Sequence, residues 1–316
     1  MIDRYGRSIT YLRLSVTDRC NLRCRYCMPA DGVTIKRHED MLSEDEMICA
    51  VEAAASLGVT KLRITGGEPL VKRNILSICR RAARVPGIRE VCVTTNGILL
   101  PDLAPDLREA GVSRVNISLD TLNPDKYAAI TRVGTLERAL AGIRAALDVG
   151  FDRVKINAVL IGGFNDGEIR ALAEMTRREP LDVRFIELMP MPGTEAFGPE
   201  AFIPVSRVTD TLQELEEDGS EGVARLYRLP GAKGRVGLIS PVSQHFCAAC
   251  NRIRLTADGR LKPCLHAADE ICIKGMDAAA MREAMARAMY EKPRCHAELG
   301  AFSPSLSARN MNQIGG

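Results

Sequence analysis

The chain contains no tryptophan, and aromatic residues make up only 4% of its 316 positions. Its core must therefore be filled mainly by Ala, Leu, Ile, Val and Met, as is common in proteins where helices alternate with parallel strands. Because 46% of the residues are hydrophobic, they can fill a substantial core. The length suits one large domain or two medium ones.

The sequence also lacks a long apolar run, repeats of the solenoid type and low-complexity tracts. No stretch is long enough to cross a membrane, and residues 1–8 carry charges where a signal peptide needs an apolar core. We therefore expect a cytoplasmic protein that does not bind a membrane. The 43 basic and 40 acidic side chains nearly balance, which argues against a broad nucleic-acid surface and leaves room for a local anion site.

Three of the eleven cysteines, Cys20, Cys24 and Cys27, form a CxxxCxxC run. In a reducing compartment, cysteines are more often metal ligands or buried thiols than disulfide partners. Three thiolates suit three corners of a four-iron cluster, which leaves the fourth iron open to a small molecule. A three-cysteine zinc site is the alternative, although structural zinc usually spaces its cysteines in pairs.

A second group consists of the CxxC pair Cys247 and Cys250, followed by Cys264. Asp258-Gly259 is typical of a hairpin turn between two short strands, and such a hairpin would bring Cys264 back beside the pair. A second cluster with an open iron and a Cys3His zinc site both fit this spacing. Other side chains compete for the remaining ligand positions: His245, His266, Cys272 and Cys295.

Short runs rich in β-formers alternate with stretches of helical periodicity. The strand runs are 11–16, 60–65, 90–95, 114–119, 153–160 and 181–188, and the clearest helical patterns are 46–57 and 136–149. Ser43 and Glu46 form a capping-box pattern, and Gly58, Gly111 and Gly150 stand where helix C-caps belong. The alternation predicts an α/β fold, an incomplete (β/α)6 TIM-like barrel with its active site at the carboxyl ends of the strands.

Each of the later predicted strands contains or ends in polar residues or glycine, and these residues should converge on the first cysteine group. They are Thr65-Gly66-Gly67-Glu68-Pro69, Thr94-Thr95-Asn96-Gly97, Ser118-Leu119-Asp120, Lys155 and Asn157, and Glu187-Leu188-Met189-Pro190.

A Gly/Pro-rich link follows Pro190. It divides the chain into a barrel domain, 1–190, and a C-terminal domain, 191–316, which we expect to be a smaller α+β extension that closes the barrel. In the second domain the patterns predict a helix near 206–217, whose acidic end faces solvent, and strands at 223–229 and 235–240.

Several of these motifs resemble known families. CxxxCxxC with Tyr26 directly before its last cysteine, together with the GGEP loop at 66–69, resembles the radical S-adenosylmethionine (SAM) enzymes. The run SQHFCAACNRIRLTADGRLKPCL and the final NQIGG resemble, more narrowly, the GTP 3′,8-cyclases of molybdenum-cofactor biosynthesis. The likeness extends nearly end to end, through the blocks LRLSVTDRCNLRCRYCMP, ITGGEPL, TTNG and NISLD.

The resemblance implies two [4Fe–4S] clusters and SAM as cofactors, with GTP as substrate. In that family the first cluster binds SAM and cleaves it to a 5′-deoxyadenosyl radical, while the second binds the guanine. The radical removes a ribose hydrogen, and C3′ then attacks C8 to give (8S)-3′,8-cyclo-7,8-dihydroguanosine 5′-triphosphate. The implied ligands are Cys20, Cys24 and Cys27 for the first cluster and Cys247, Cys250 and Cys264 for the second.

The sequence contains no GxxxxGK[ST] phosphate loop, so separate side chains must hold the triphosphate. By motif position, the resemblance implies SAM contacts from Tyr26, Gly67, Ser118 and Met189. It implies GTP contacts from Arg13, Arg63, Thr94, Lys155, Arg184, Arg252, Ile253 and Arg254. The terminal Gly315 and Gly316 are expected to enter the active site and take part in catalysis.

The implied partners are an electron donor of the flavodoxin or ferredoxin type and the next enzyme of the pathway, cyclic pyranopterin monophosphate synthase, with the chain itself a monomer or homodimer. Two other functions compete. One is another radical SAM enzyme with two clusters, such as a peptide-modifying maturase, and the other is an electron carrier without catalysis.

Overall fold

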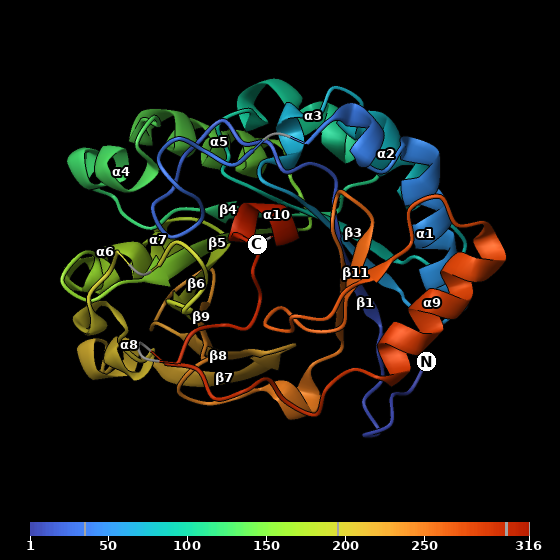
Figure 1. The fold of residues 1–316 in the computed structure, drawn as a ribbon. Helices are drawn as coiled ribbons and strands as arrows, with labels where there is room; N and C mark the ends of the chain where they lie inside the picture. Colours follow the sequence, from blue (N-terminus) through green and yellow to red (C-terminus); the bar gives the residue numbers. More distant parts are fainter. Residues whose placement is uncertain (35, 195, 301–302, 316) are drawn as a thin grey trace.

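The computed structural model describes residues 1–34, 36–194, 196–300 and 303–315. Their strands form one continuous curled sheet, with helices around its outside (Figure 1). The strand order is β12-β11-β10-β1-β2-β3-β4-β5-β6-β9-β8-β7. Among the described residues the edge strands β12 and β7 do not pair with each other, so the sheet is not closed.

The barrel strands lie where the sequence predicts them, and each pairs in parallel with the next. They are β1 (Tyr11–Ser15), β2 (Lys61–Thr65), β3 (Glu90–Thr95), β4 (Arg114–Ser118), β5 (Arg153–Leu160) and β6 (Leu181–Glu187). The helices between them are α1 (Glu44–Ser56), α2 (Ile75–Ala83), α3 (Leu100–Glu109), α4 (Pro124–Thr131), α5 (Leu136–Val149), α6 (Ile169–Ala173) and α7 (Met175–Arg178). This confirms the incomplete (β/α) barrel.

Local signals account for several element ends. The Ser43 hydroxyl accepts a hydrogen bond from the Glu46 amide, and the Glu46 carboxylate accepts one from the Ser43 amide, so the predicted capping box is formed. Helix α5 ends at Gly150, whose φ of 73° is left-handed and costs glycine little. Inside the wall, Leu12 and Leu14 of β1 are fully buried in the hydrophobic core, while Arg13 between them faces the barrel interior.

The C-terminal segment lengthens the barrel wall at both edges of the sheet. Strand β9 (Val236–Ile239) pairs in parallel with β6, and β10 (Arg252–Leu255) pairs in parallel with β1. Antiparallel strands continue outward from them: β8 (Ala224–Arg228) and β7 (Glu216–Glu221) on one side, β11 (Arg260–Lys262) and β12 (Ile271–Cys272) on the other. The sheet therefore crosses the predicted division at residue 190, and that division stays a prediction.

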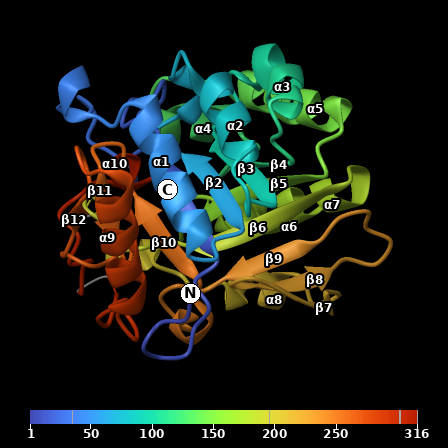
Figure 2. The ribbon, with the colours of Figure 1, turned by 90° about the vertical axis from the view of Figure 1, so that its right-hand side faces the viewer.

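Two short helices and one long one complete the C-terminal segment. Helix α9 (Ala278–Tyr290) packs beside α1 on the outside (Figure 2). Helix α10 (Met311–Ile314) instead lies in the middle of the ring of strands, so the end of the chain is inside the barrel (Figure 1). Helix α8 (Ser206–Thr211) lies near α6. No helix among the described residues has the length and apolar character needed to span a bilayer.

The helix expected over 206–217 is wrong in its second half. Helix α8 ends at Thr211, and the acidic residues after it begin strand β7 at Glu216. A bulge between Glu217 and Ser220 includes Gly219 with a φ of 79°, and the strand then places Glu221 among basic side chains. Long-range ion pairing thus decides the conformation here. The predicted hairpin at Asp258-Gly259 is confirmed by the antiparallel pairing of β10 with β11.

Candidate active site

A cavity of about 290 Å³ opens inside the barrel, and both cysteine groups line it. Most of the predicted site residues line the same cavity: Arg13, Tyr26, Arg63, Gly67, Thr94, Ser118, Arg184, Met189, Arg252 and Arg254. Residues that are far apart in sequence, such as Arg13 and Cys264, therefore face a single space. The lining does not include Lys155, Ile253 or Gly315.

The loop that carries Cys20, Cys24 and Cys27 follows β1 and rests on the end of helix α4. The amides of Arg23 and Arg25 donate to the carbonyl oxygens of Thr131 and Ile130. The guanidinium of Arg132 donates to the carbonyl oxygens of Arg23, at 2.7 Å, and Met28, at 3.2 Å.

Arg132 has a φ of 65°, an unusual backbone conformation for a residue with a side chain. Its guanidinium bonds reach residues on both sides of the last two cysteines, so this strained residue holds the cysteine loop in place. A lone arginine after a helix gives no sequence signal of such a role.

Burial controls the protonation of the first cysteine group. It raises the pKa of Cys20 to about 11 and that of Cys27 to about 12, and it also raises the pKa of Cys24. All three are free thiols. Because metal ligands must be thiolates, binding of a metal centre here must release protons.

The second cysteine group lies toward the other end of the strands, because Cys247 and Cys250 precede β10, whereas the first group follows the parallel strand β1. Cys247 and Cys250 flank a short turn before β10, and Cys264 follows β11. Burial opposes ionisation of Cys250, yet the charges of Lys292 and Arg252 lower its pKa. The Lys292 ammonium, which is only 3% exposed, donates to the Pro263 carbonyl at 2.5 Å. This site is therefore more electropositive than the first.

The competing ligands of the second group are less well placed. Cys272 lies in β12 and Cys295 is exposed, and neither lines the cavity. His266 does line it, but its Nδ1 lies 3.1 Å from the Ser305 hydroxyl, and its ring packs against His296. Cys264 is therefore the third cysteine of the second group that lines the cavity. Two sets of three free thiols around one cavity fit two four-iron clusters, each with an iron left open.

The GGEP loop joins the end of β2 to the cysteine loop. The amides of Gly67 and Glu68 donate to the carbonyl oxygens of Thr17 and Arg19, each at 2.8 Å. A Cβ at Gly67 would meet the backbone of Arg19, so only glycine allows this approach. The Glu68 carboxylate accepts hydrogen bonds from the Thr95 hydroxyl and from the backbone amide of Asn96. Burial raises the pKa of Glu68 to about 7.

The other predicted SAM contacts lie near this loop. Tyr26 donates its hydroxyl proton to Asp120 at 2.7 Å, and Asp120 also accepts from the Val159 amide. Ser118 and Met189 line the cavity at the ends of β4 and β6. Sequence reasoning named Asp120 as a strand-end residue but gave it no role; the structure makes it the partner that orients Tyr26.

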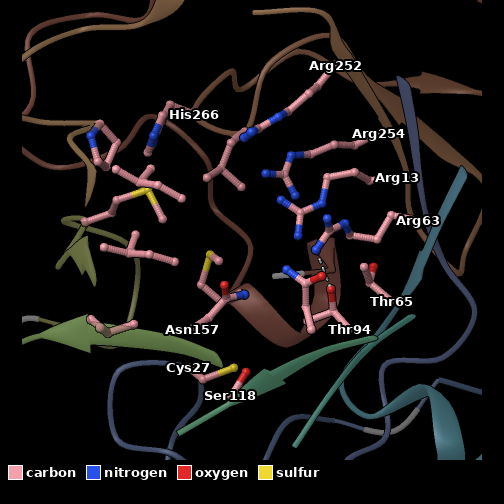
Figure 3. Close-up of a pocket in the computed structure, with 18 of the residues that line it drawn as sticks. Arg13, Cys27, Arg63, Thr65, Thr94, Ser118, Asn157, Arg252, Arg254 and His266 are labelled. Carbon is pink, nitrogen blue, oxygen red and sulfur yellow. Dashed lines mark hydrogen bonds between the residues drawn. The ribbon is translucent and has the colours of Figure 1, made fainter. Parts of the chain in front are cut away.

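Four arginines form a basic wall between the two cysteine groups. Arg13 lies in register with Arg63 on one neighbouring strand and with Arg254 on the other, and Arg252 is two residues before Arg254. Their guanidinium groups point into the cavity from one side (Figure 3). Arg63 donates to the Thr94 hydroxyl at 3.0 Å.

The basic wall is largely buried. Burial, followed by the neighbouring charge of Arg252, lowers the pKa of Arg254 to about 10. The Nε of Arg252 is buried and has no hydrogen-bond partner among the described residues. Like charges held together out of water are costly unless an anion joins them. The wall is therefore built for an anionic ligand.

Three predicted GTP contacts are placed differently from one another. Arg184 reaches the cavity. Lys155 is fully buried and its ammonium lies 2.6 Å from the Glu221 carboxylate. The Ile253 side chain belongs to the hydrophobic core, since it points away from the interior between two inward arginines. The structure therefore brings Arg184 to the cavity and keeps the side chains of Lys155 and Ile253 outside its lining.

The C-terminal tail enters the barrel beside the basic wall. Arg254 donates to the carbonyl oxygen of Gly315 at 2.7 Å, and Asn312 donates to that of Asp18 at 2.9 Å. Gly315 has a φ of 83°, and a Cβ there would clash with the Thr65 hydroxyl. Gly316 lies outside the described residues.

The tail is held by a contact that sequence reasoning missed. Arg309 makes paired hydrogen bonds to Glu270, at 2.7 and 2.8 Å, and to Asp258, at 3.0 and 3.2 Å. We call Arg309, Asp258 and Glu270 the tail latch. Its members are 12 to 51 positions apart, so no local sequence pattern predicts that they are in contact.

Comparison with known proteins agrees with this geometry. The radical SAM superfamily model matches residues 14–176, and the model named Molybdenum Cofactor Synthesis C matches residues 181–298. The chain is 49% identical to the GTP 3′,8-cyclase of Moorella thermoacetica and 47% identical to that of Alkaliphilus oremlandii, with all of each chain covered.

Among solved structures, SuiB of Streptococcus suis superposes with a TM-score of 0.65 at 15% identity, over 91% of this chain and 66% of SuiB. That likeness concerns the fold alone. The full-length identity to curated relatives is far higher and spans both cysteine groups and the basic wall between them. The chain thus belongs to the GTP 3′,8-cyclase family of radical SAM proteins.

Proposed function

We propose that this protein is a radical SAM lyase that converts GTP to (8S)-3′,8-cyclo-7,8-dihydroguanosine 5′-triphosphate, the first step of molybdenum-cofactor biosynthesis. The observation that carries the proposal is the buried basic wall between two sets of three cysteines around one cavity. Such a space can hold an anionic substrate between two metal centres. Membership of the GTP 3′,8-cyclase family supports GTP as that anion.

The cofactors of this family are two [4Fe–4S] clusters and SAM, and the thiol groups fit them. Cys20, Cys24 and Cys27 would hold the first cluster, and Cys247, Cys250 and Cys264 the second. When bound and reduced, the first cluster supplies the electron that cleaves SAM, and the second offers an open iron to guanine. We favour this assignment over the two zinc sites that the spacing alone leaves open, because the family uses two clusters.

The chain's own residues bind and orient the two small molecules. We assign the SAM contacts to Tyr26, Gly67, Ser118 and Met189, where the Asp120 hydrogen bond fixes the Tyr26 ring and the glycine exposes backbone. We assign the GTP contacts to Arg13, Arg63, Thr94, Lys155, Arg184, Arg252, Ile253 and Arg254.

Each group of GTP contacts has a separate task. The arginines neutralise the triphosphate, because guanidinium groups bind phosphate oxygens in pairs of hydrogen bonds. Ile253 would meet the base only through its backbone, since its side chain is in the core. A site inside the barrel would limit the access of water to reactive intermediates, and Gly315, held by Arg254, brings the tail to this region.

The proposed activity is tested by anaerobic reconstitution followed by incubation with GTP, SAM and a reductant. We expect about eight irons per chain, 5′-deoxyadenosine and the cyclised nucleotide. Formation of 5′-deoxyadenosine without consumption of GTP would instead support another radical SAM enzyme, such as a maturase. Absence of 5′-deoxyadenosine would support an electron carrier, and four irons with one zinc would restore the zinc site.

The roles of the two cysteine groups are separable by mutation. Cys250→Ser should retain SAM cleavage, because the first group is intact, but should lose cyclisation of GTP. The matched control is Cys295→Ser, since Cys295 is exposed and does not line the cavity. The measurement is the ratio of cyclised product to 5′-deoxyadenosine. An unchanged ratio in Cys250→Ser would contradict the assignment of the second group.

We further propose that the protein works in the cytoplasm as a monomer or homodimer. An electron donor of the flavodoxin or ferredoxin type would reduce it, and cyclic pyranopterin monophosphate synthase would take up its product. The absence of a bilayer-spanning helix among the described residues is compatible with this setting.

A further inference from the structure

Glu221, at the end of β7, joins side chains from four other parts of the sheet. Its carboxylate lies 2.6 Å from the Lys155 ammonium and 3.3 Å from the Arg184 guanidinium. Three more cations approach it: Arg114 at 2.8 Å, Arg153 at 3.0 Å and Arg235 at 3.4 Å. No other described carboxylate has five basic side chains around it, and no motif marked this residue.

The cations around Glu221 outnumber the anions. Apart from Glu221 itself, Asp182 and Glu90 are the only carboxylates among the described residues that pair with members of this group. Four of the five cations approach the same oxygen, Oε2, which cannot satisfy all their donors. The Nη2 of Arg184 is the atom that lies 3.3 Å from Glu221, whereas its Nε is buried without a hydrogen-bond partner among the described residues, and Arg184 lines the cavity. The group therefore retains positive charge beside the cavity.

We propose that Glu221 is a positioning residue for the triphosphate of GTP: it holds Arg184, which lines the cavity, beside Lys155, which is buried behind the lining, before the substrate arrives. This inference rests on the proposed function and adds a residue to it. Glu221 itself does not touch the substrate; it acts through the two cations it holds.

The protonation of Lys155 explains why a carboxylate is needed. Burial and then the charge of Arg184 lower the pKa of Lys155 to about 7, and Glu221 opposes that shift. Asp182 of β6 and Glu221 of β7 pair with Lys155, and the charges of Arg184 of β6 and Arg114 of β4 also act on it. The other cations that pair with Glu221 are Arg153 of β5 and Arg235 before β9. That pKa of about 7 applies with Glu221 in place, so without Glu221 the pKa of Lys155 should fall further and the lysine should attract phosphate less.

The test is Glu221→Gln, with Glu217→Gln as the control, since Glu217 is exposed on the same strand. The KM for GTP and kcat are measured with the anaerobically reconstituted holoenzyme between about pH 6.5 and pH 8.5. At about pH 8 we expect the KM of Glu221→Gln to rise, by about tenfold for each unit that the loss of Glu221 takes from the pKa of Lys155. The kcat at saturating GTP should stay close to wild type.

The pH profile separates positioning from a general loss of structure. In Glu221→Gln the KM should fall back toward the wild-type value as the pH is lowered, because Lys155 regains its proton. Glu221→Asp should give an intermediate KM, since it keeps the negative charge but moves the carboxylate farther from Lys155 and Arg184. It replaces Glu221→Gln as the test variant if that variant does not fold. Glu217→Gln should match wild type throughout.

Two results would overturn the inference. A lower KM in Glu221→Gln would mean that Glu221 competes with the triphosphate for its cations, and a KM unaffected at every pH would mean that it does not act on the site. Failure of the wild-type protein to convert GTP at all would count against the proposed function instead, so the two ideas fail separately.

Discussion

Replacing Arg309 with alanine should release the C-terminal tail from the barrel. The Arg309 guanidinium is only 17% exposed and makes two hydrogen bonds to Glu270 and two to Asp258. Removing one partner of a buried ion pair typically costs about 3–5 kcal/mol. Here both carboxylates keep another cation, Lys36 on Asp258 and Lys262 on Glu270, so we expect a cost of about 2 kcal/mol.

A cost of that size corresponds to about a 30-fold fall in the ratio of docked to released tails. Amide hydrogen exchange of residues 311–315, followed by mass spectrometry, measures this ratio directly. Formation of the cyclised nucleotide should fall toward the level of a chain truncated after residue 314, while iron content stays at the wild-type level. The control is Arg287→Ala, which removes an ion pair to Glu291 from a side chain that is 69% exposed and should change neither measurement.

The tail-latch reasoning would be refuted if Arg309→Ala left exchange of residues 311–315 unchanged. Loss of protection across the whole barrel would refute it equally, because the latch joins the tail only to the β10–β11 turn and to Glu270.

Two further substitutions test the packing of the barrel and of the cysteine loop. Gly142→Ala should lower the free energy of unfolding by about 2 kcal/mol in urea denaturation, since a Cβ would collide with the Gly97 carbonyl; Gly167→Ala, with open space around it, should change it little. Arg132→Ala should speed the loss of iron to a chelator about tenfold, because side chains that support metal ligands contribute to metal affinity, whereas the exposed Arg144→Ala should have no effect. Equal stability in the glycine pair, or equal chelation rates in the arginine pair, would count against the respective argument.

The sequence predicted the parts of the fold that depend on local signals. The barrel strands and helix α5 were placed to within a residue or so, because β-rich runs, a capping box and left-handed glycines act over a few positions. The lengthening of the sheet by β9 and β10 was not predicted, since those pairings join residues that are roughly 50 and 240 positions apart and leave no periodic trace. The acidic stretch before Glu221 was taken for a helix end for the same reason.

The candidate site divides in a similar way. Cysteine spacing identified both cysteine groups that line the cavity, and motif position placed Arg13 and Arg254 on the wall where the structure has them. The surroundings of Lys155 could not be predicted, because its partner Glu221 is 66 residues away on an irregular hairpin. The role of Arg309 could not be predicted, because the sequence does not show whether an arginine is exposed or makes buried ion pairs with distant carboxylates such as Asp258 and Glu270.

The pairing of β10 with β1 has a consequence for how the molecule can be divided. The peptide hydrogen bonds of one sheet set the spacing between the two cysteine groups, so neither group can move away on a hinge. A fragment cut near residue 190 would leave β1 and β6 with bare rows of unpaired amides and carbonyls, the kind of edge on which proteins aggregate. The two cysteine groups are therefore held at a fixed separation by one continuous sheet.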